Sequence, residues 1–158
     1  MKVNNNLLEN PTHWNGSLVD GTLFSGTGKT SVLSFYGIIE KYPTTHTVRV
    51  LGTLRLRRND NDLSNYYAGF PLINLLTYVG LTTNNIPQYS VYRELGTAVY
   101  GTNTNLNGEG GRVYQVENTK NIGLGRLYDL STGTIGAWAW DTIGYQAVQV
   151  DFTVIYTD

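Results

Sequence analysis

Several stretches of the chain alternate between apolar and polar residues, which is the pattern of a β-strand with one buried face. The clearest is Thr47–Arg58, where every second residue is apolar apart from Gly52, a position at which a bulge would fit. The last stretch, Val148–Tyr156, has the same period and predicts a long C-terminal strand on which the sheet depends. Further strands are expected at Ser31–Ile39, Gln88–Leu95, Arg112–Glu117, Ile122–Asp129 and Thr134–Thr142.

One segment has a helical period instead. After Pro71, which suits a first helical turn, and before Gly80, which suits a helix end, four apolar residues recur at helical spacing. They are Leu72, Leu75, Leu76 and Val79. The pattern predicts a short helix near residues 71–80, and a buried strand is the alternative. Together these elements predict one domain over residues 1–158, an all-β antiparallel β-sandwich or jelly roll with one short helix.

Composition narrows the chemistry. Only 15% of the 158 residues are charged, against about 25% in typical soluble domains. The net charge of −1 disfavours nucleic acid, which is bound through clustered Lys and Arg. With no cysteine, the chain holds no disulfide and no thiolate nucleophile. No stretch is apolar enough for a signal peptide or for insertion into a membrane, so we expect a protein made in the cytoplasm.

Motifs for cofactors and metals fail on their spacing, so no cofactor and no metal are expected. Gly26–Ser31 contains a Gly-Lys-Thr sequence, but a phosphate-binding loop needs glycine at position 23, which is Leu23. The two histidines, His13 and His46, lie too far apart in the chain to suggest a zinc site. Asp60–Asp62 could offer oxygen ligands to calcium, although a solvated turn is the favoured interpretation.

Catalysis is not expected either. Carboxylate pairs of the glycosidase kind depend on spatial separation, which a sequence does not show. Asp141 lies beside Trp138 and Trp140 and is the best single candidate, because an aromatic environment can raise the pKa of a carboxyl group. On a strand, however, Asp141 would point away from both tryptophans.

Aromatic residues carry the strongest functional indication. Flat rings combined with short polar side chains suit the apolar faces and hydroxyl rims of sugars, and large rings are favoured at recognition surfaces. Core packing is the competing interpretation, especially for Trp138 and Trp140 on one strand face. The candidate ligand-binding residues are His13, Trp14, Arg57, Asp60, Asp62, Tyr66, Tyr67, Trp138, Trp140 and Asp141.

Four arginines lie on the polar face of the predicted strand Thr47–Arg58 or at its end. They are Arg49, Arg55, Arg57 and Arg58. We expect them to pair with carboxylates of a neighbouring subunit and to protect a sheet edge from aggregation. Contact with an anionic sugar or a phosphate substituent is the alternative.

The opening segment Asn5–Gly16, with its Asn-Leu-Leu, Asn-Pro and Trp pattern, resembles the start of jelly-roll carbohydrate-binding modules. The cysteine-free composition rich in Thr, Asn, Gly and Tyr, and the closing strand Gln146–Tyr156, are similar to receptor-binding head domains of bacteriophage tails and baseplates. This resemblance implies a homotrimeric, non-catalytic adhesin of the virion that recognises a host cell-surface polysaccharide.

Three functions therefore follow as hypotheses. The first is a carbohydrate-binding module of a phage tail or baseplate. The second is a structural virion or assembly module that binds other tail or baseplate proteins. The third is a polysaccharide-degrading enzyme.

Overall fold

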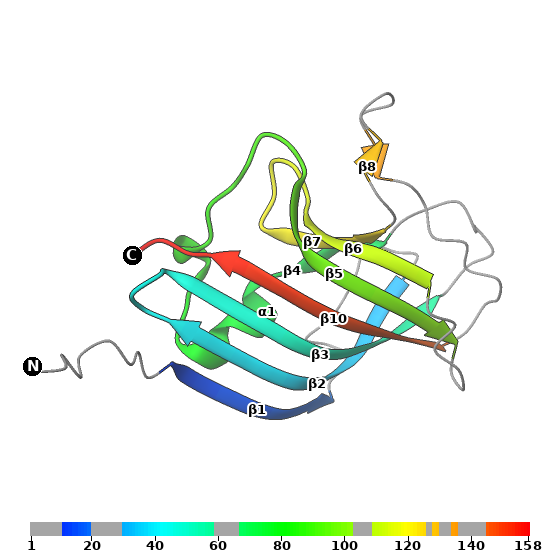
Figure 1. The fold of residues 1–158 in the computed structure, drawn as a ribbon, viewed down its shortest axis with the longest axis horizontal. Helices are drawn as coiled ribbons and strands as arrows, with labels where there is room; N and C mark the ends of the chain where they lie inside the picture. Colours follow the sequence, from blue (N-terminus) through cyan, green and yellow to red (C-terminus); the bar gives the residue numbers. More distant parts are fainter. Residues whose placement is uncertain are drawn as a thin grey trace, which may run out of the picture.

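A computed structural model shows one antiparallel sheet of eight strands with a short helical segment behind it (Figure 1). The structure describes residues 11–19, 30–58, 67–102, 109–125, 128–129, 134–135 and 145–158. The strands of the sheet are β1 (Thr12–Val19), β2 (Thr30–Tyr42), β3 (Thr47–Arg58), β4 (Tyr67–Pro71), β5 (Arg93–Thr102), β6 (Glu109–Gln115), β7 (Asn121–Gly125) and β10 (Tyr145–Ile155). The expected all-β, antiparallel, sandwich-like fold with one short helix is confirmed, with its eight strands in a single open sheet.

The C-terminal strand lies in the middle of this sheet. The strand order is β1-β2-β3-β10-β5-β6-β7-β4. β10 pairs with β3 from Tyr145 to Ile155 and with β5 from Gln146 to Phe152. Because β10 supplies hydrogen bonds to both neighbours, the two halves of the sheet are joined only through it, as the long closing alternation predicted.

Alternation along the strands separates a buried face from an outer face, the term used below for the side of the sheet away from the core. On β3, Val48, Val50 and Leu54 are fully buried, while Arg49, Leu51 and Arg55 are exposed on the outer face. The bounds of β3 are those predicted. The bulge expected at Gly52 is wrong, since the β2–β3 register is continuous there and shifts between Val32 and Ser34 instead.

The predicted helix is present as α1 (Ile73–Leu76) followed by the 3₁₀ turn η2 (Thr77–Val79). Its four apolar residues are all buried in the core under the sheet. Gly80 ends the segment with a φ of 77°, a left-handed conformation that glycine adopts without strain. Pro71 is the last residue of β4 and not the first of the helix, so that detail of the prediction is wrong. None of the helices in the described residues is long and apolar enough to cross a membrane.

The predicted strand Gln88–Leu95 is wrong over residues 88–92, which form a loop, and its last three residues are the start of β5 at Arg93. Backbone carbonyl groups of this loop accept hydrogen bonds from the end of β6 and from the turn that follows it, and not from a neighbouring strand. The buried Gln115 side chain donates to the carbonyl oxygens of Pro87 and Thr119, at 2.6 and 3.1 Å. The amide of Asn118 donates to the carbonyl of Tyr89 at 2.7 Å. These contacts give the carbonyl oxygens of Pro87 and Tyr89 hydrogen-bond donors without a neighbouring strand.

Two other predicted strands differ in extent. Ile122–Asp129 divides into β7 and the short β8 (Tyr128–Asp129), which pairs with β9 (Thr134–Ile135) in a separate two-stranded sheet. Of the predicted strand Thr134–Thr142, β9 is the part that the structure describes. The strands β1 and β4 were not predicted.

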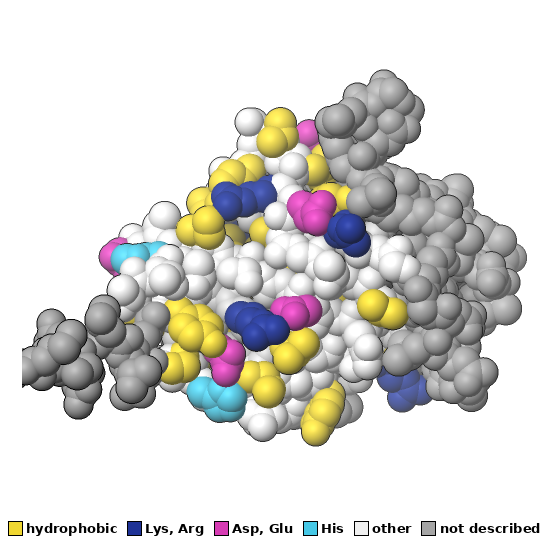
Figure 2. All heavy atoms as spheres, in the orientation of Figure 1, with side chains coloured by type: hydrophobic (Ala, Val, Ile, Leu, Met, Phe, Trp, Pro, Cys, Tyr) yellow, Lys and Arg dark blue, Asp and Glu magenta, His cyan; other side chains and the backbone are white. Residues whose placement is uncertain are grey.

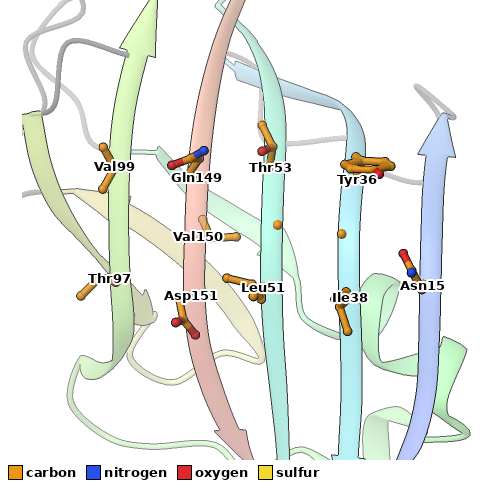
Figure 3. Close-up of a pocket in the computed structure, with 12 residues that line it drawn as sticks. Asn15, Tyr36, Ile38, Leu51, Thr53, Thr97, Val99, Gln149, Val150 and Asp151 are labelled. Atoms are coloured by element: carbon orange, nitrogen blue, oxygen red, sulfur yellow. The ribbon is translucent and has the colours of Figure 1, made fainter.

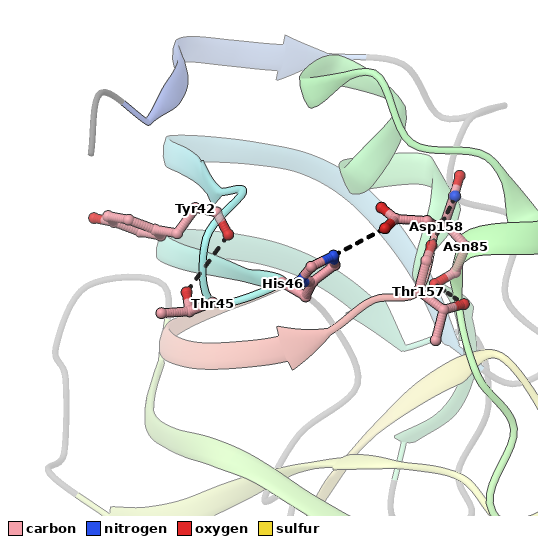
Figure 4. Close-up of polar contacts among 6 residues, drawn as sticks. All are labelled: Tyr42, Thr45, His46, Asn85, Thr157 and Asp158. Carbon is pink, nitrogen blue, oxygen red and sulfur yellow. Dashed lines mark hydrogen bonds and ion pairs between the residues drawn. The ribbon is translucent and has the colours of Figure 1, made fainter. Parts of the chain in front are cut away.

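A set of contacts fixes the end of β10 against the β2–β3 turn and the 3₁₀ turn η3 (Thr83–Asn85), as Figure 4 shows. His46 Nε2 lies 3.0 Å from a carboxylate oxygen of Asp158, and the His46 carbonyl accepts from the Tyr156 amide at 2.9 Å. Thr157 and Asn85 exchange two hydrogen bonds of 2.8 Å, from the Thr157 amide and from the Asn85 side-chain amide. We call these contacts the C-terminal clasp.

Candidate functional site

Three glycines lie directly opposite one another on neighbouring strands. Gly16 of β1 pairs with Gly37 of β2, which pairs with Gly52 of β3. A Cβ placed on Gly37 or Gly52 would collide with backbone of the adjacent strand. These positions therefore require glycine, because the two backbones approach too closely for any side chain. We call these three residues the glycine row.

Aromatic rings cover the glycine row on the buried face. The Phe35 ring lies 2.9 Å and 2.7 Å from where the Cβ atoms of Gly37 and Gly52 would be. The Trp14 ring lies 3.1 Å from the corresponding position on Gly16. Trp14 and Phe35 stack with ring centroids 6.1 Å apart, and Tyr78 of η2 packs on Trp14 at 5.3 Å. The rings fill the space that the missing side chains leave, which is a known way of stabilising glycine in a sheet.

A groove lies over the glycine row on the outer face. Glycines are places where a sheet bends, and β2 and β3 bend along their length in Figure 1. The hollow has a volume of about 490 Å³, and backbone of Gly37, Gly52 and Val150 forms its floor. The other lining residues stand along its two sides (Figure 3): Asn15, Tyr36, Ile38, Leu51, Thr53, Thr97, Val99, Gln149 and Asp151.

Strand register arranges the sides of the groove as two parallel rows. Along one side, the paired residues are Tyr36, Thr53, Gln149 and Val99. Along the other side they are Asn15, Ile38, Leu51, Asp151 and Thr97. Each row runs across the strands, so the groove is perpendicular to the chain direction.

The lining mixes apolar surface with uncharged polar groups. Tyr36 is 66% exposed and Leu51 is 41% exposed, so both present apolar surface to the groove. Asn15 and Gln149 are exposed beside them and offer amide donors and acceptors. Figure 2 shows that most of this face consists of uncharged polar side chains and backbone, with charged side chains in a few small groups of mixed sign.

Among the described residues that line the groove, Asp151 carries the one charged side chain, and its charge is compensated. Arg49 donates two hydrogen bonds to Asp151, from Nε to Oδ1 at 3.1 Å and from Nη2 to Oδ2 at 2.9 Å. These hydrogen bonds lower the pKa of the Asp151 carboxyl below its ordinary value of 3.8 and raise the pKa of Arg49. Asp151 is therefore ionised at neutral pH and held by its partner, and it is not poised to act as a general acid, which needs a raised pKa.

A second polar group lies next to Arg49. Glu40, the cross-strand partner of Arg49, accepts a hydrogen bond of 2.8 Å from the Tyr42 hydroxyl and lies 3.5 Å from Nδ1 of His13. These residues flank the groove without lining it. In the described part of the chain, no three His, Asp or Glu side chains gather closely enough to hold a metal ion.

Comparison of the chain with protein-family models, curated proteins and solved structures found no match.

The structure places some of the sequence-predicted binding residues, but not in the groove. His13 is on the outer face beside Glu40, one row beyond the groove. Trp14 is half-buried on the opposite face, within the packing of Phe35 and Tyr78. Tyr67 begins β4 and Arg57 lies near the end of β3, and only the backbone of each is described. The remaining candidates lie outside the described residues: Asp60, Asp62, Tyr66, Trp138, Trp140 and Asp141.

The four arginines of β3, Arg49, Arg55, Arg57 and Arg58, do not protect a sheet edge, so that expectation is wrong. β3 is an interior strand between β2 and β10. Arg49 is held by Asp151 of the same chain, and the exposed Arg55 lies on the same outer face.

Sequence reasoning did not single out Tyr36, Leu51 or Gln149 as binding residues. A signal was present in the first two, because each is a large apolar residue at a position that the alternation assigns to the polar face.

Proposed function

We propose that the groove binds an uncharged saccharide and that the protein does so without catalysis. The observation that supports this proposal is the groove itself, in which the exposed side chains of Tyr36 and Leu51 lie beside the polar side chains of Asn15, Thr53 and Gln149. Sugars carry C–H groups on their ring faces and hydroxyl groups around the rim. A lining that offers apolar contact and amide or hydroxyl groups side by side matches both.

The rigidity of the site favours binding. Each lining residue except Asn15, which is on the edge strand β1, stands on a strand that is paired on both sides. Little backbone freedom is lost when a ligand binds, so more of the contact energy appears as affinity. The Arg49–Asp151 pair compensates the one charge among the described lining residues, which suits a neutral ligand.

The source of the saccharide follows from the resemblance. The ends of the chain resemble carbohydrate-binding modules and phage receptor-binding heads, so a host envelope polysaccharide is the first ligand to test. The protein would then act as the adhesive module of a phage tail or baseplate. Release of reducing ends from that polysaccharide would instead favour the degrading enzyme, with Asp141→Asn as the inactive control.

Two matched substitutions test the groove. Leu51 and Ile155 are 41% and 40% exposed, both on the outer face, but only Leu51 lines the groove. We expect Leu51→Ala to weaken binding of a host polysaccharide about five-fold or more, since truncating a buried apolar contact costs about 1 kcal/mol. Ile155→Ala should leave binding unchanged. Equal behaviour of the two variants in titration calorimetry would show that the groove is not the site.

The exposed apolar side chains also favour a second function, which is binding of other protein subunits through the outer face. Tyr36, Ile38 and Leu51 form a neighbouring set of the kind found at the centre of protein interfaces. Native mass spectrometry of the protein alone and with tail or baseplate proteins distinguishes the two functions. A complex that Tyr36→Ala and Leu51→Ala abolish, in a protein that binds no polysaccharide, would establish the assembly module.

A further inference from the structure

We propose that the groove binds the middle of a linear, uncharged polysaccharide that runs across the strands and contacts about four consecutive sugars. This inference rests on the proposed saccharide function and names the form of the ligand. It follows from the direction, the length and the open ends of the groove.

The length comes from the strands that contribute to the lining. Residues of β1, β2, β3, β10 and β5, five neighbouring strands, line the groove. At about 4.8 Å between strands, the groove is about 19 Å long. The length of one sugar in an extended pyranose chain is close to this distance between strands. About four sugars therefore fill the groove, one for each pair of neighbouring strands.

The two rows of side chains support an extended chain. On either side of the floor, the residues are directly paired from strand to strand, for example Thr53 with Gln149 and Leu51 with Asp151. Successive sugars would therefore lie between the two rows of side chains, and those in the middle would lie above the backbone of Gly37, Gly52 and Val150. A single sugar would use a small part of this surface, and the rest would stay hydrated.

Within the described residues, the ends of the groove are not walled. At one end lies Asn15 of β1, which is an edge strand of the sheet. At the other end, Val99 pairs with Gly110 of β6, and a Cβ on Gly110 would meet no atom within 4 Å. Arg112, the cross-strand partner of Thr97, stands beyond the other row at this end, and Glu94 holds its guanidinium at 3.0 Å. No described residue closes either end, and an open-ended groove fits a polymer that continues past both ends better than a terminal sugar.

The experiment is a length series. Titration calorimetry uses the full chain with β-1,4-linked glucose and β-1,4-linked N-acetylglucosamine oligomers of one to eight sugars, beside an array of neutral linear glycans carrying the same lengths. We expect the affinity for the series that binds to rise at least about ten-fold from two sugars to four and to change little beyond six.

Two distant variants test whether one ligand spans the groove. Asn15→Ala and Thr97→Ala remove polar groups at opposite ends, and each should weaken binding of a hexasaccharide about three- to ten-fold, the loss of one hydrogen bond. A disaccharide should be weakened by at most one of them. Thr153→Ala, on the outer face of β10 but outside the groove, is the control and should change neither.

The outcomes separate the two proposals. If one or two sugars bind as tightly as four, or if only one end variant affects the hexasaccharide, the extended-chain inference is overturned while saccharide binding stands. If no glycan of any length binds, the proposed function is overturned and this inference with it.

Discussion

Gly37 and Gly52 face each other across β2 and β3, and the ring of Phe35 covers both from the buried side. This arrangement couples the core to the groove, because the same two residues expose their backbone as the groove floor on the outer face. A substitution at either glycine should therefore affect both the stability of the protein and the binding of a ligand in the groove.

Substituting Gly52 by alanine should destabilise the protein by about 1–3 kcal/mol, the usual cost of overpacking a core. The added Cβ would lie 2.7 Å from the Phe35 ring and would also meet the carbonyl oxygen of Tyr36. Thermal unfolding followed by circular dichroism measures the effect. Gly110→Ala is the control, since its Cβ would enter open space and should leave the melting temperature almost unchanged. Similar melting temperatures for the two variants would contradict the close approach described for Gly52.

Tyr36 and Trp14 should separate ligand contact from core packing. Tyr36→Ala should weaken saccharide binding and change stability by less than about 0.5 kcal/mol, because the side chain is 66% exposed. Trp14→Ala should instead cost about 2–4 kcal/mol, since its ring packs on Phe35, Tyr78 and Gly16. Chemical denaturation and titration of both variants check this. A Trp14→Ala protein that folds normally but does not bind saccharide would show that the site is on the face of Trp14 and not in the groove.

Asp151 should make stability depend on pH. Its folded-state pKa is lowered by the hydrogen bonds from Arg49, so its contribution is present above the ordinary carboxyl pKa and is lost as the pH falls through the lowered value. Both side chains are nearly half exposed, which limits the pair to about 1 kcal/mol or less. Asp151→Asn should therefore be slightly less stable than the native protein at pH 7. The difference should vanish in acid, as urea denaturation at several pH values can measure. A difference that stays constant down to pH 2 would exclude the ion pair as its cause.

The C-terminal clasp should hold the end of the central strand. Asn85→Ala removes the hydrogen bond to the Thr157 carbonyl, at 2.8 Å, and the acceptor for the Thr82 amide in the capping box of η3. We expect a loss of about 1 kcal/mol and faster hydrogen exchange of the Tyr156 and Thr157 amides. The neighbouring exposed Asn84 supplies the control variant, Asn84→Ala. Unchanged exchange in Asn85→Ala would mean that the clasp does not restrain β10.

The sequence by itself determined the local structure wherever a period was long and uninterrupted. The alternation over Thr47–Arg58 predicted the bounds of β3, and the helical spacing of Leu72–Val79 predicted the helical segment. Both patterns reflect the burial of one face of a single element, which neighbouring residues decide. Where tertiary hydrogen bonds replace strand pairing, as for Gln115 with Pro87, the local pattern predicted a strand that begins five residues before β5 does.

Only the tertiary structure decided the order and register of the strands, and with them the groove. A period of two fixes which side chains share a face, but not which strand lies beside which. The pairing of β2 with β3 places Tyr36 beside Thr53, and the insertion of β10 between β3 and β5 adds Gln149 to the same row from a distant part of the chain. The same pairing placed Trp14 among core rings on the other face. The groove could not be predicted because it depends on backbone pairing between distant segments, and no single segment encodes that pairing.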